Sequence, residues 1–269
     1  MKGGVIPMHL ISQLETFDID PNHIITNKFA FNNKQQIDYV WIKEQLDYTN
    51  ALTDRQKHIV YSYTIYGDKF INYHLRGKLT LKLIKDIVDE CKKNKENPFK
   101  YQHLDKTGKI EIDDQYVENI VEYIVAFIEE FRDIIIHSPR LRKNIKVFRG
   151  LKDGHYIINS IQGGFMINSD FISTSIYLAS ASNFMNGDCC LLELYIDVDT
   201  PCLFTANLSR RRGEYEITLI NKTVMKYMRC TKKYILDNAE YYHDLSVFFS
   251  PEKQDVSIIR MCEFKVSAL

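Results

Sequence analysis

The hydrophobic pattern of this chain changes from helical to strand-like near residue 144, and this change constrains the fold more than any other feature. Before it, apolar residues recur at helical spacing, as they do from Leu83 to Cys91. After it come short runs of β character, and the run 192–198 alternates apolar and polar side chains. Helices followed by strands indicate an α+β fold with a mainly antiparallel sheet or a two-sheet core.

Local signals indicate where several helices begin. Thr53 and Gln56 have capping-box spacing, and Thr80 is expected to cap the helix that follows it. Gly67-Asp68 is expected to break the helix that starts at Thr53. We expect helices over residues 39–46, 53–66, 71–75, 81–91 and 114–136, and strands over residues 145–149, 171–175, 191–198, 202–206, 215–220, 224–230 and 258–266.

The first 48 residues show no clear period and are interrupted by Pro7 and Pro21. We therefore expect an N-terminal extension over residues 1–48 and one domain over residues 49–269. A chain of 269 residues is long enough for one large domain with a sizeable core.

Charge and cysteine usage argue against several classes of protein. Lys and Arg total 35 and Asp and Glu total 35, so the formal charge is zero, which argues against a nucleic-acid partner. The longest apolar-rich segment, 120–136, also carries charged residues, so we expect an amphipathic helix and no membrane span. The six cysteines include no CxxC pair, and we expect them to be reduced and to bind no metal. No secretory signal is evident, so we expect a cytoplasmic protein.

The common nucleotide-binding and hydrolase motifs are missing. The sequence contains no GxGxxG, Walker A, HExxH or GxSxG. A Rossmann dehydrogenase, a P-loop NTPase and an α/β-hydrolase are therefore poorly supported.

Three short elements on separate expected strands remain as candidates for chemistry. Arg149 ends the first strand and suits bidentate phosphate binding, while Gly150 would let a bulky ligand approach the backbone. The second element, Ser173-Thr174-Ser175, carries three hydroxyl groups, and its two serines share one face.

The third element is Glu214-Tyr215-Glu216, at the start of an expected strand. Alternation would put both carboxylates on one side, roughly 7 Å apart, and Tyr215 on the apolar side with Ile217 and Leu219. Taken singly, each element also has an ordinary structural explanation. The arginine could form a surface salt bridge, the S-T-S element could be an ordinary part of a strand, and the E-x-E element could be a solvated strand face. Their order on separate strands favours one shared site.

The order Arg, then S-T-S, then E-x-E resembles the R-S-E class of mono-ADP-ribosyltransferases, which includes bacterial exotoxin-type enzymes that modify arginine. Tyr63-Thr64, Ile71-Asn72 and Leu75-Arg76 are similar to the first helices of that family. The resemblance runs from about Leu52 to Thr223, with a further strand at 258–266. It implies the family's α+β fold, a catalytic domain over the main part of the chain, NAD as co-substrate, and an arginine of a target protein as acceptor.

The resemblance also implies a role for each matching residue. Glu216 would be the catalytic glutamate, Ser173 would orient it, and Glu214 would handle the acceptor. Arg149 would hold the NAD phosphates, beside Gly150. The remaining matches are two hydroxyls that support the strand and three positions that line the NAD pocket, the last of them over nicotinamide: Thr174, Ser175, Tyr63, Asn72 and Phe184.

Two carboxylates suit this chemistry. Cleavage of the nicotinamide–ribose bond builds positive charge on the ribose, which a fixed carboxylate stabilises. A guanidinium has a pKa above about 12 and is a poor nucleophile while charged, so a second carboxylate can bind it and take its proton. No metal is required, and NAD hydrolysis by water is the expected side reaction.

Arg210-Arg211-Arg212 stands before the E-x-E element and also fits an ordinary solvated loop. Under the resemblance this loop touches the protein substrate, and three arginines would favour an acidic target surface. Actin-modifying members often carry further basic residues where this chain has Gly150 and Gly187, which weakens an actin assignment. Two alternatives stay open: an NAD glycohydrolase or non-arginine transferase on the same fold, and a catalytically inactive binding module.

Overall fold

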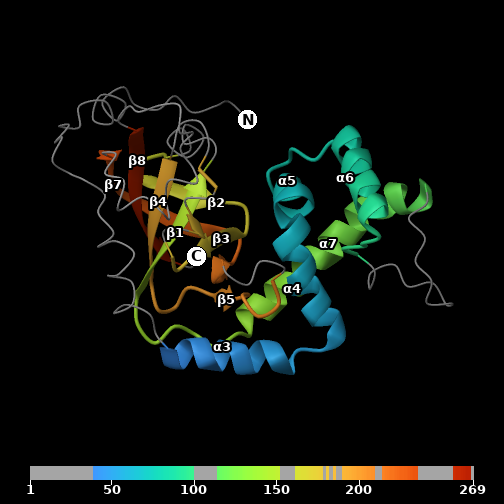
Figure 1. Cartoon of the computed structure of the whole chain (residues 1–269), viewed down its shortest axis with the longest axis horizontal. Coiled ribbons are helices and arrows are strands. Elements are labelled where there is room, and N and C mark those ends of the chain that lie inside the picture. Colours follow the sequence, from blue (N-terminus) through green and yellow to red (C-terminus); the bar gives the residue numbers. More distant parts are fainter. Residues whose placement is uncertain are drawn as a thin grey trace.

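The computed structural model describes residues 39–99, 114–151, 161–177, 180–181, 184–185, 190–209, 214–235 and 257–267. Within them the helices come first, from α3 (Tyr39–Ala51) onwards, and the strands follow from β1 (Ile145–Leu151). Figure 1 shows helices and sheet as two neighbouring halves, with α3 along the bottom of the view. The α+β fold expected from the change of period is confirmed. None of the described helices is long and apolar enough to cross a membrane.

Two of the helices begin where the sequence carries capping signals. The Thr53 side chain accepts a hydrogen bond from the Gln56 N–H, and the Gln56 side chain accepts one from the Thr53 N–H, as a capping box requires. Thr80 accepts from the Leu83 N–H in the same way. The helices after α3 are α4 (Asp54–Tyr66), α5 (Asn72–Leu75), α6 (Leu81–Asn94) and α7 (Asp114–Ile136).

The helix that starts after Thr53 ends at Tyr66, as expected, but Gly67 does not take the chain out of the helical path. Gly67–Ile71 forms a π-helical turn, η2, that joins α4 directly to α5. A Cβ atom at Gly67 would lie 2.4 Å from the Tyr63 ring, so the absence of a side chain lets this ring pack against the turn. The glycine provides space inside a helix, and its backbone dihedrals are helical.

The strands form one sheet in the order β2-β7-β8-β4-β1-β3-β6-β5. Every neighbouring pair is antiparallel except β4 with β8, so the sheet is mixed but mainly antiparallel. The strands after β1 are β2 (Phe165–Asn168), β3 (Ile172–Ser175), β4 (Cys190–Ile196), β5 (Cys202–Phe204), β6 (Glu216–Leu219), β7 (Thr223–Ile235) and β8 (Ser257–Ser267).

β2 is the strand that the sequence did not predict. It pairs with β7 at the edge of the sheet. Phe165 and Ile167 are exposed there while Met166 between them is buried. Apolar residues therefore occur on both faces of β2, and the alternation that marks a half-buried strand is missing.

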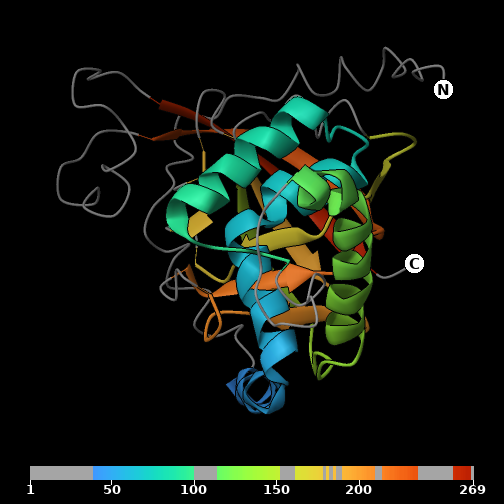
Figure 2. The same ribbon diagram turned by 90° about the vertical axis from the view of Figure 1, so that its right-hand side faces the viewer.

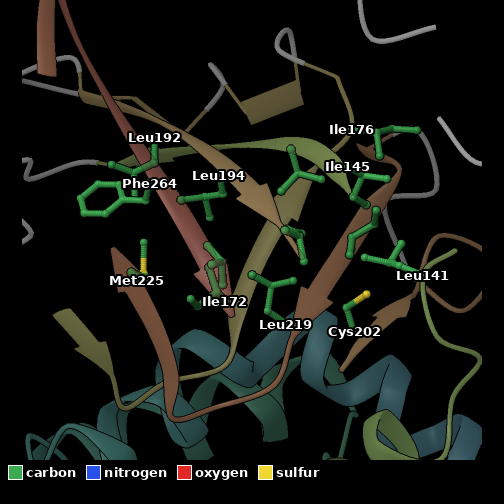
Figure 3. Close-up of a cluster of buried hydrophobic side chains, with 14 of the residues drawn as sticks. Leu141, Ile145, Ile172, Ile176, Leu192, Leu194, Cys202, Leu219, Met225 and Phe264 are labelled. Carbon is green, nitrogen blue, oxygen red and sulfur yellow. The ribbon is translucent and has the colours of Figure 1, made fainter. Parts of the chain in front are cut away.

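Strands on both sides of the β1–β3 pairing contribute to one hydrophobic core (Figure 3). Leu192 and Phe264, from β4 and β8, belong to the same buried cluster as Ile172 and Leu219, from β3 and β6. The two halves are joined by the pairing of β1 with β3. The expected two-sheet core therefore corresponds to two halves of one continuous sheet.

The helices have a second core built around aromatic rings. The Phe131 ring lies 4.4 Å from the Tyr63 ring and 4.8 Å from the Phe171 ring, measured between centroids. Phe171 directly precedes β3, so this core reaches the strand that carries the three hydroxyls. Figure 2, a view turned by 90°, shows α4 and α7 together in front of the strands.

α3 is attached to the strand half of the chain. The Trp41 Nε1 and Gln45 Nε2 groups donate hydrogen bonds of 2.9 and 2.8 Å to the Pro139 carbonyl. The Gln45 Oε1 atom accepts a 3.1 Å bond from the Phe204 N–H. α3 continues across residue 48, the end of the expected extension.

The expectation that all cysteines are reduced was wrong for one of them. Cys262 is disulfide-bonded, and its backbone partner across the β7–β8 pairing is Cys230. Cys91 and Cys202 are free thiols, and these two residues and Cys190 are buried, as expected for core residues.

Candidate active site

The fold brings the three sequence elements together on adjacent strands. β3 lies between β1 and β6 in the sheet. Ser175 pairs with Phe148 on one side and with Glu216 on the other. Arg149, the S-T-S element and Glu216, which are far apart in the sequence, therefore occupy one region of the sheet.

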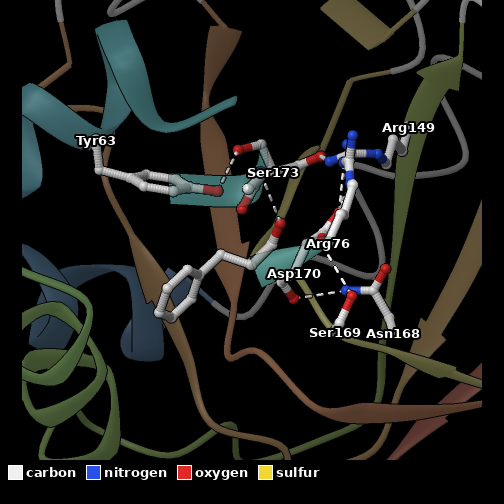
Figure 4. A network of polar contacts seen from close by, with 9 residues as sticks. Tyr63, Arg76, Arg149, Asn168, Ser169, Asp170 and Ser173 are labelled. Atoms are coloured by element: carbon white, nitrogen blue, oxygen red, sulfur yellow. Dashed lines mark hydrogen bonds and ion pairs between the residues drawn. The ribbon is translucent and has the colours of Figure 1, made fainter. Parts of the chain in front are cut away.

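Arg149 points toward β3 and binds its backbone. Its Nη1 atom donates a 2.7 Å hydrogen bond to the Ser173 carbonyl, as Figure 4 shows. Burial lowers the pKa of this guanidinium, and the positive charge of Arg76 lowers it further. Two arginines from different halves of the chain therefore lie near one another.

Arg76 is a site residue to which the sequence analysis gave no role. It forms an ion pair with Asp170, whose side chain is buried just before β3 (Figure 4). The Asn168 side-chain amide donates a 2.5 Å hydrogen bond to the Asp170 carbonyl and holds this turn. The sequence contained the signal in the Leu75-Arg76 match, but only the fold puts this side chain beside Arg149.

Tyr63 and Ser173 connect the helical half to the strand half. Their hydroxyl oxygens lie 3.3 Å apart (Figure 4). Burial and the nearby charge of Glu216 raise the pKa of Tyr63, so this phenol stays neutral and can share a hydrogen bond. Asn72 is also buried, and its side-chain amide donates a 3.3 Å hydrogen bond to the Phe171 carbonyl.

Glu216 is the buried carboxylate of the site. It begins β6, is 7% exposed, and accepts a 3.1 Å hydrogen bond from the Thr218 hydroxyl. Burial raises the pKa of Glu216, and the charge of Glu214 acts in the same direction. The neighbouring hydroxyls of Ser173, Thr218 and Thr205 oppose this rise because they stabilise the ionised form.

Glu214 and Glu216 do not lie on one continuous strand, so the predicted alternation was wrong. β6 begins only at Glu216. Tyr215 has a left-handed backbone with φ 46°, and its ring is not on the inner face but is 42% exposed. A left-handed residue interrupts the period of two, so the strand-based spacing of the carboxylates does not apply. Glu214 itself is partly buried.

Thr174 and Ser175 bind the backbone of the segment that carries the two glutamates. The Thr174 hydroxyl donates a 2.7 Å hydrogen bond to the Ile217 carbonyl. The Ser175 hydroxyl donates a 2.6 Å bond to the Glu214 carbonyl. These contacts fix β3 to β6 on both sides of Glu216.

Gly150 is close to the chain's own backbone. A Cβ atom there would lie 2.0 Å from the Ala181 carbonyl oxygen, so the turn that follows β3 fills the space expected for a ligand. Phe184, in the same turn, is 40% exposed. Gly187 and the arginines 210–212 lie outside the described residues. Among the described side chains, no group of three or more His, Cys, Asp or Glu is placed to hold a metal ion.

A helical half joined to a mainly antiparallel sheet is the fold of the ADP-ribosyltransferase toxins. The sequence model for ADP-ribosyltransferase exoenzymes matches residues 39–248, and the chain belongs to this family. A comparison with curated protein sequences finds no significant match.

Solved structures of ADP-ribosyltransferases have the same fold. The ATR domain of SpvB from Salmonella aligns with a TM-score of 0.51 at 16% identity, over 80% of this chain and 100% of that one. The C3 exoenzyme of Clostridium limosum aligns with 0.50 at 13% identity, over 91% and 96%. The BECa toxin of C. perfringens, solved with NADH, aligns with 0.51 at 10% identity, over 88% and 48%. At these identities the likeness shows the fold alone.

Proposed function

We propose that this protein transfers ADP-ribose from NAD to an arginine of a target protein and releases nicotinamide. The observation that carries this proposal is the buried Glu216 carboxylate on β6, stabilised by Ser173 of the neighbouring strand β3, whose other neighbour β1 carries Arg149. Membership of the exoenzyme family supports the reaction class. The NADH in the BECa structure supports a nicotinamide dinucleotide as substrate.

Glu216 is assigned the central role at the ribose. When the bond between ribose C1′ and nicotinamide breaks, its electron pair leaves with the nicotinamide and positive charge develops on the sugar. A fixed carboxylate stabilises that charge, and it does so strongly in a site from which water is largely excluded. Ser173 and Thr218 favour the ionised form of Glu216 that this role needs.

Arg149 and Arg76 suit the diphosphate of NAD. Guanidinium groups bind phosphate oxygens with paired hydrogen bonds, and two of them match two linked phosphates. Arg149 is held by the Ser173 carbonyl and Arg76 by Asp170, so both approach a ligand in a fixed orientation. Tyr63 and Asn72, with Thr174, Ser175 and Phe184, are assigned to the surrounding pocket, whereas Gly150 is packed against the Ala181 backbone.

Glu214 is assigned to the acceptor. The acceptor guanidinium nitrogen forms the new bond to ribose C1′, and the proton it loses passes to a base, for which Glu214 is the available carboxylate next to Glu216. The target surface is proposed to be acidic, met by Arg210, Arg211 and Arg212. Action on a protein target in the cytoplasm of a host cell accords with the exotoxin-type relatives.

A second candidate function is NAD hydrolysis without transfer. The observation that favours it is the left-handed backbone of Tyr215. Because of it, Glu214 lies outside β6 and the strand does not fix the Glu214 side chain on the same face as Glu216. Incubation of the protein with labelled NAD and whole-cell lysate tests the two functions. Mass spectrometry of a labelled protein would give target and acceptor residue, whereas release of nicotinamide and free ADP-ribose without any labelled protein would establish hydrolysis.

A further inference from the structure

Tyr215 has a costly backbone conformation and an exposed ring between the two site glutamates. Its φ of 46° is in the left-handed region, where a bulky residue is uncommon because Cβ approaches the backbone. Its side chain is 42% exposed, although it is a large aromatic. Backbone strain that persists beside a candidate active site is a reason to look for a function of that residue.

The segment Ser175–Tyr177 holds Tyr215 in this conformation. The Ile176 N–H donates a 3.5 Å bond to the Tyr215 carbonyl, and the Ser175 hydroxyl donates to the Glu214 carbonyl. The same Ser175 oxygen accepts a 3.0 Å bond from the Tyr177 N–H. The backbones of Glu214, Tyr215 and Tyr177 are therefore all hydrogen-bonded to Ser175 or Ile176.

Tyr177 and Tyr215 form an aromatic pair beside Glu214. Their ring centroids are 4.8 Å apart, and their planes are inclined by 78°. Tyr177 is partly buried and packs on the core of the sheet, which gives the pair a fixed base. In such an edge-to-face pair, each contact covers at most one ring face, so an exposed ring keeps a face for a ligand.

The chemistry of this pair suits a cationic acceptor. Aromatic faces attract cations, and the planar guanidinium of arginine stacks on them more readily than the ammonium of lysine. Glu214, the residue that precedes Tyr215, carries a carboxylate that also attracts a cation. We propose that Tyr215 and Tyr177 form the subsite that binds the acceptor guanidinium and delivers it to Glu214. This inference rests on the proposed arginine-specific transfer and names the residues that select its acceptor.

Replacement of Tyr215 by glycine tests the subsite, because glycine adopts the left-handed conformation without strain and removes only the ring. The substrates are NAD and agmatine, a small guanidine, and both nicotinamide release and ADP-ribosyl-agmatine are measured. We expect Tyr215→Gly to raise the KM for agmatine about 2- to 30-fold, the range of one cation–π contact. The ratio of transfer to hydrolysis should fall by a similar factor at low agmatine.

Three further variants separate ring loss from a general defect. Tyr215→Phe keeps the aromatic face and should restore agmatine affinity to near the wild-type value. Tyr177→Leu fills similar space without a ring and should act in the same direction as Tyr215→Gly. Tyr61→Ala removes another surface tyrosine, 36% exposed on α4, and should leave both activities as in wild type. If Tyr215→Gly is poorly folded, Tyr215→Asn replaces it, because asparagine also tolerates this conformation.

Failure of the subsite differs from failure of the proposed function. A wild-type protein that hydrolyses NAD but never modifies agmatine or a lysate protein would remove the arginine transferase itself. A wild-type protein that modifies agmatine, with an unchanged agmatine KM in both Tyr215→Gly and Tyr177→Leu, would overturn the subsite alone. Equal losses in Tyr215→Phe and Tyr215→Gly would also overturn it, because the ring face is then not what binds.

Discussion

Tyr63 and Ser173 are 110 residues apart in the chain, yet their hydroxyl oxygens lie 3.3 Å apart at the junction of the helical and strand halves. Ser173 in turn helps to stabilise the ionised form of Glu216. The Tyr63 ring is held by Phe131 and by the open side of Gly67. A position on α4 therefore influences the geometry of the candidate catalytic carboxylate.

Tyr63→Phe tests this connection. The ring contacts with Phe131 remain, and only the hydroxyl is lost, so the fold should persist with a melting temperature within a few degrees of wild type. One lost hydrogen bond of about 1 kcal/mol should lower NAD turnover roughly 5-fold, provided the geometry of Ser173 matters. Initial rates of nicotinamide release give the answer, with Tyr61→Phe as the matched surface control. Equal rates for Tyr63→Phe and wild type would show that the contact has no part in catalysis.

Gly67→Ala sets two effects of opposite sign against one another. Helix propensity favours alanine over glycine by about 1 kcal/mol at an ordinary helical position. Here the new methyl group would lie 2.4 Å from the Tyr63 ring, and such overpacking typically costs about 1–3 kcal/mol. We expect the clash to dominate, so that thermal unfolding shows a lower melting temperature and nicotinamide release falls as well. A stabilised and fully active Gly67→Ala protein would mean that the ring can move without consequence.

Arg149→Lys should weaken NAD binding. A lysine ammonium is a point charge and cannot reproduce the planar fork that holds both the Ser173 carbonyl and a phosphate. A hydrogen bond to a charged group is worth about 1.5–3 kcal/mol, so we expect the Kd for NAD to rise roughly 10- to 100-fold. Calorimetric titration measures this directly. An unchanged Kd would show that Arg149 only supports β3 and that the phosphates bind elsewhere.

Glu216→Gln should make the protein more stable at neutral pH while it removes activity. Burial raises the pKa of Glu216, so the folded protein holds this proton more readily than the unfolded chain does. The ionised carboxylate therefore opposes folding above the folded-state pKa, and this cost is absent below the ordinary pKa of glutamate. Melting curves of both proteins should diverge at neutral pH, with the variant more stable, and converge as the pH falls through that window. A variant that is less stable at neutral pH would show that hydrogen bonds to the carboxylate outweigh its burial.

The period change near residue 144 predicted the α+β fold because burial of one face imposes a period of about 3.6 residues on a helix and of two on a strand. The capping signals at Thr53 and Thr80 are local, and for this reason they also held. The continuous helical path through Gly67 was not predicted. The glycine leaves room for the Tyr63 ring, and the sequence does not show that this ring packs there.

Some residues of the candidate site could be predicted from the sequence, and others only from the fold. Arg149, Ser173 and Glu216 could be selected from the sequence because order along the chain placed them on separate strands. The place of Arg76 near Arg149 could not, because it depends on the tertiary contact between the end of α5 and Asp170, just before β3. The left-handed backbone of Tyr215 could not be foreseen either, since a tyrosine within an apolar alternation reads as extended strand.

The measurement that tests the central claim most directly is nicotinamide release with and without agmatine in wild type, Glu216→Gln and Glu214→Gln. We assign Glu216 to the ribose and Glu214 to the acceptor, so Glu216→Gln should lose both NAD hydrolysis and transfer. Glu214→Gln should lose most ADP-ribosyl-agmatine formation and keep a substantial share of hydrolysis. Near-normal turnover in Glu216→Gln, or a parallel fall of both activities in Glu214→Gln, would contradict this division of roles.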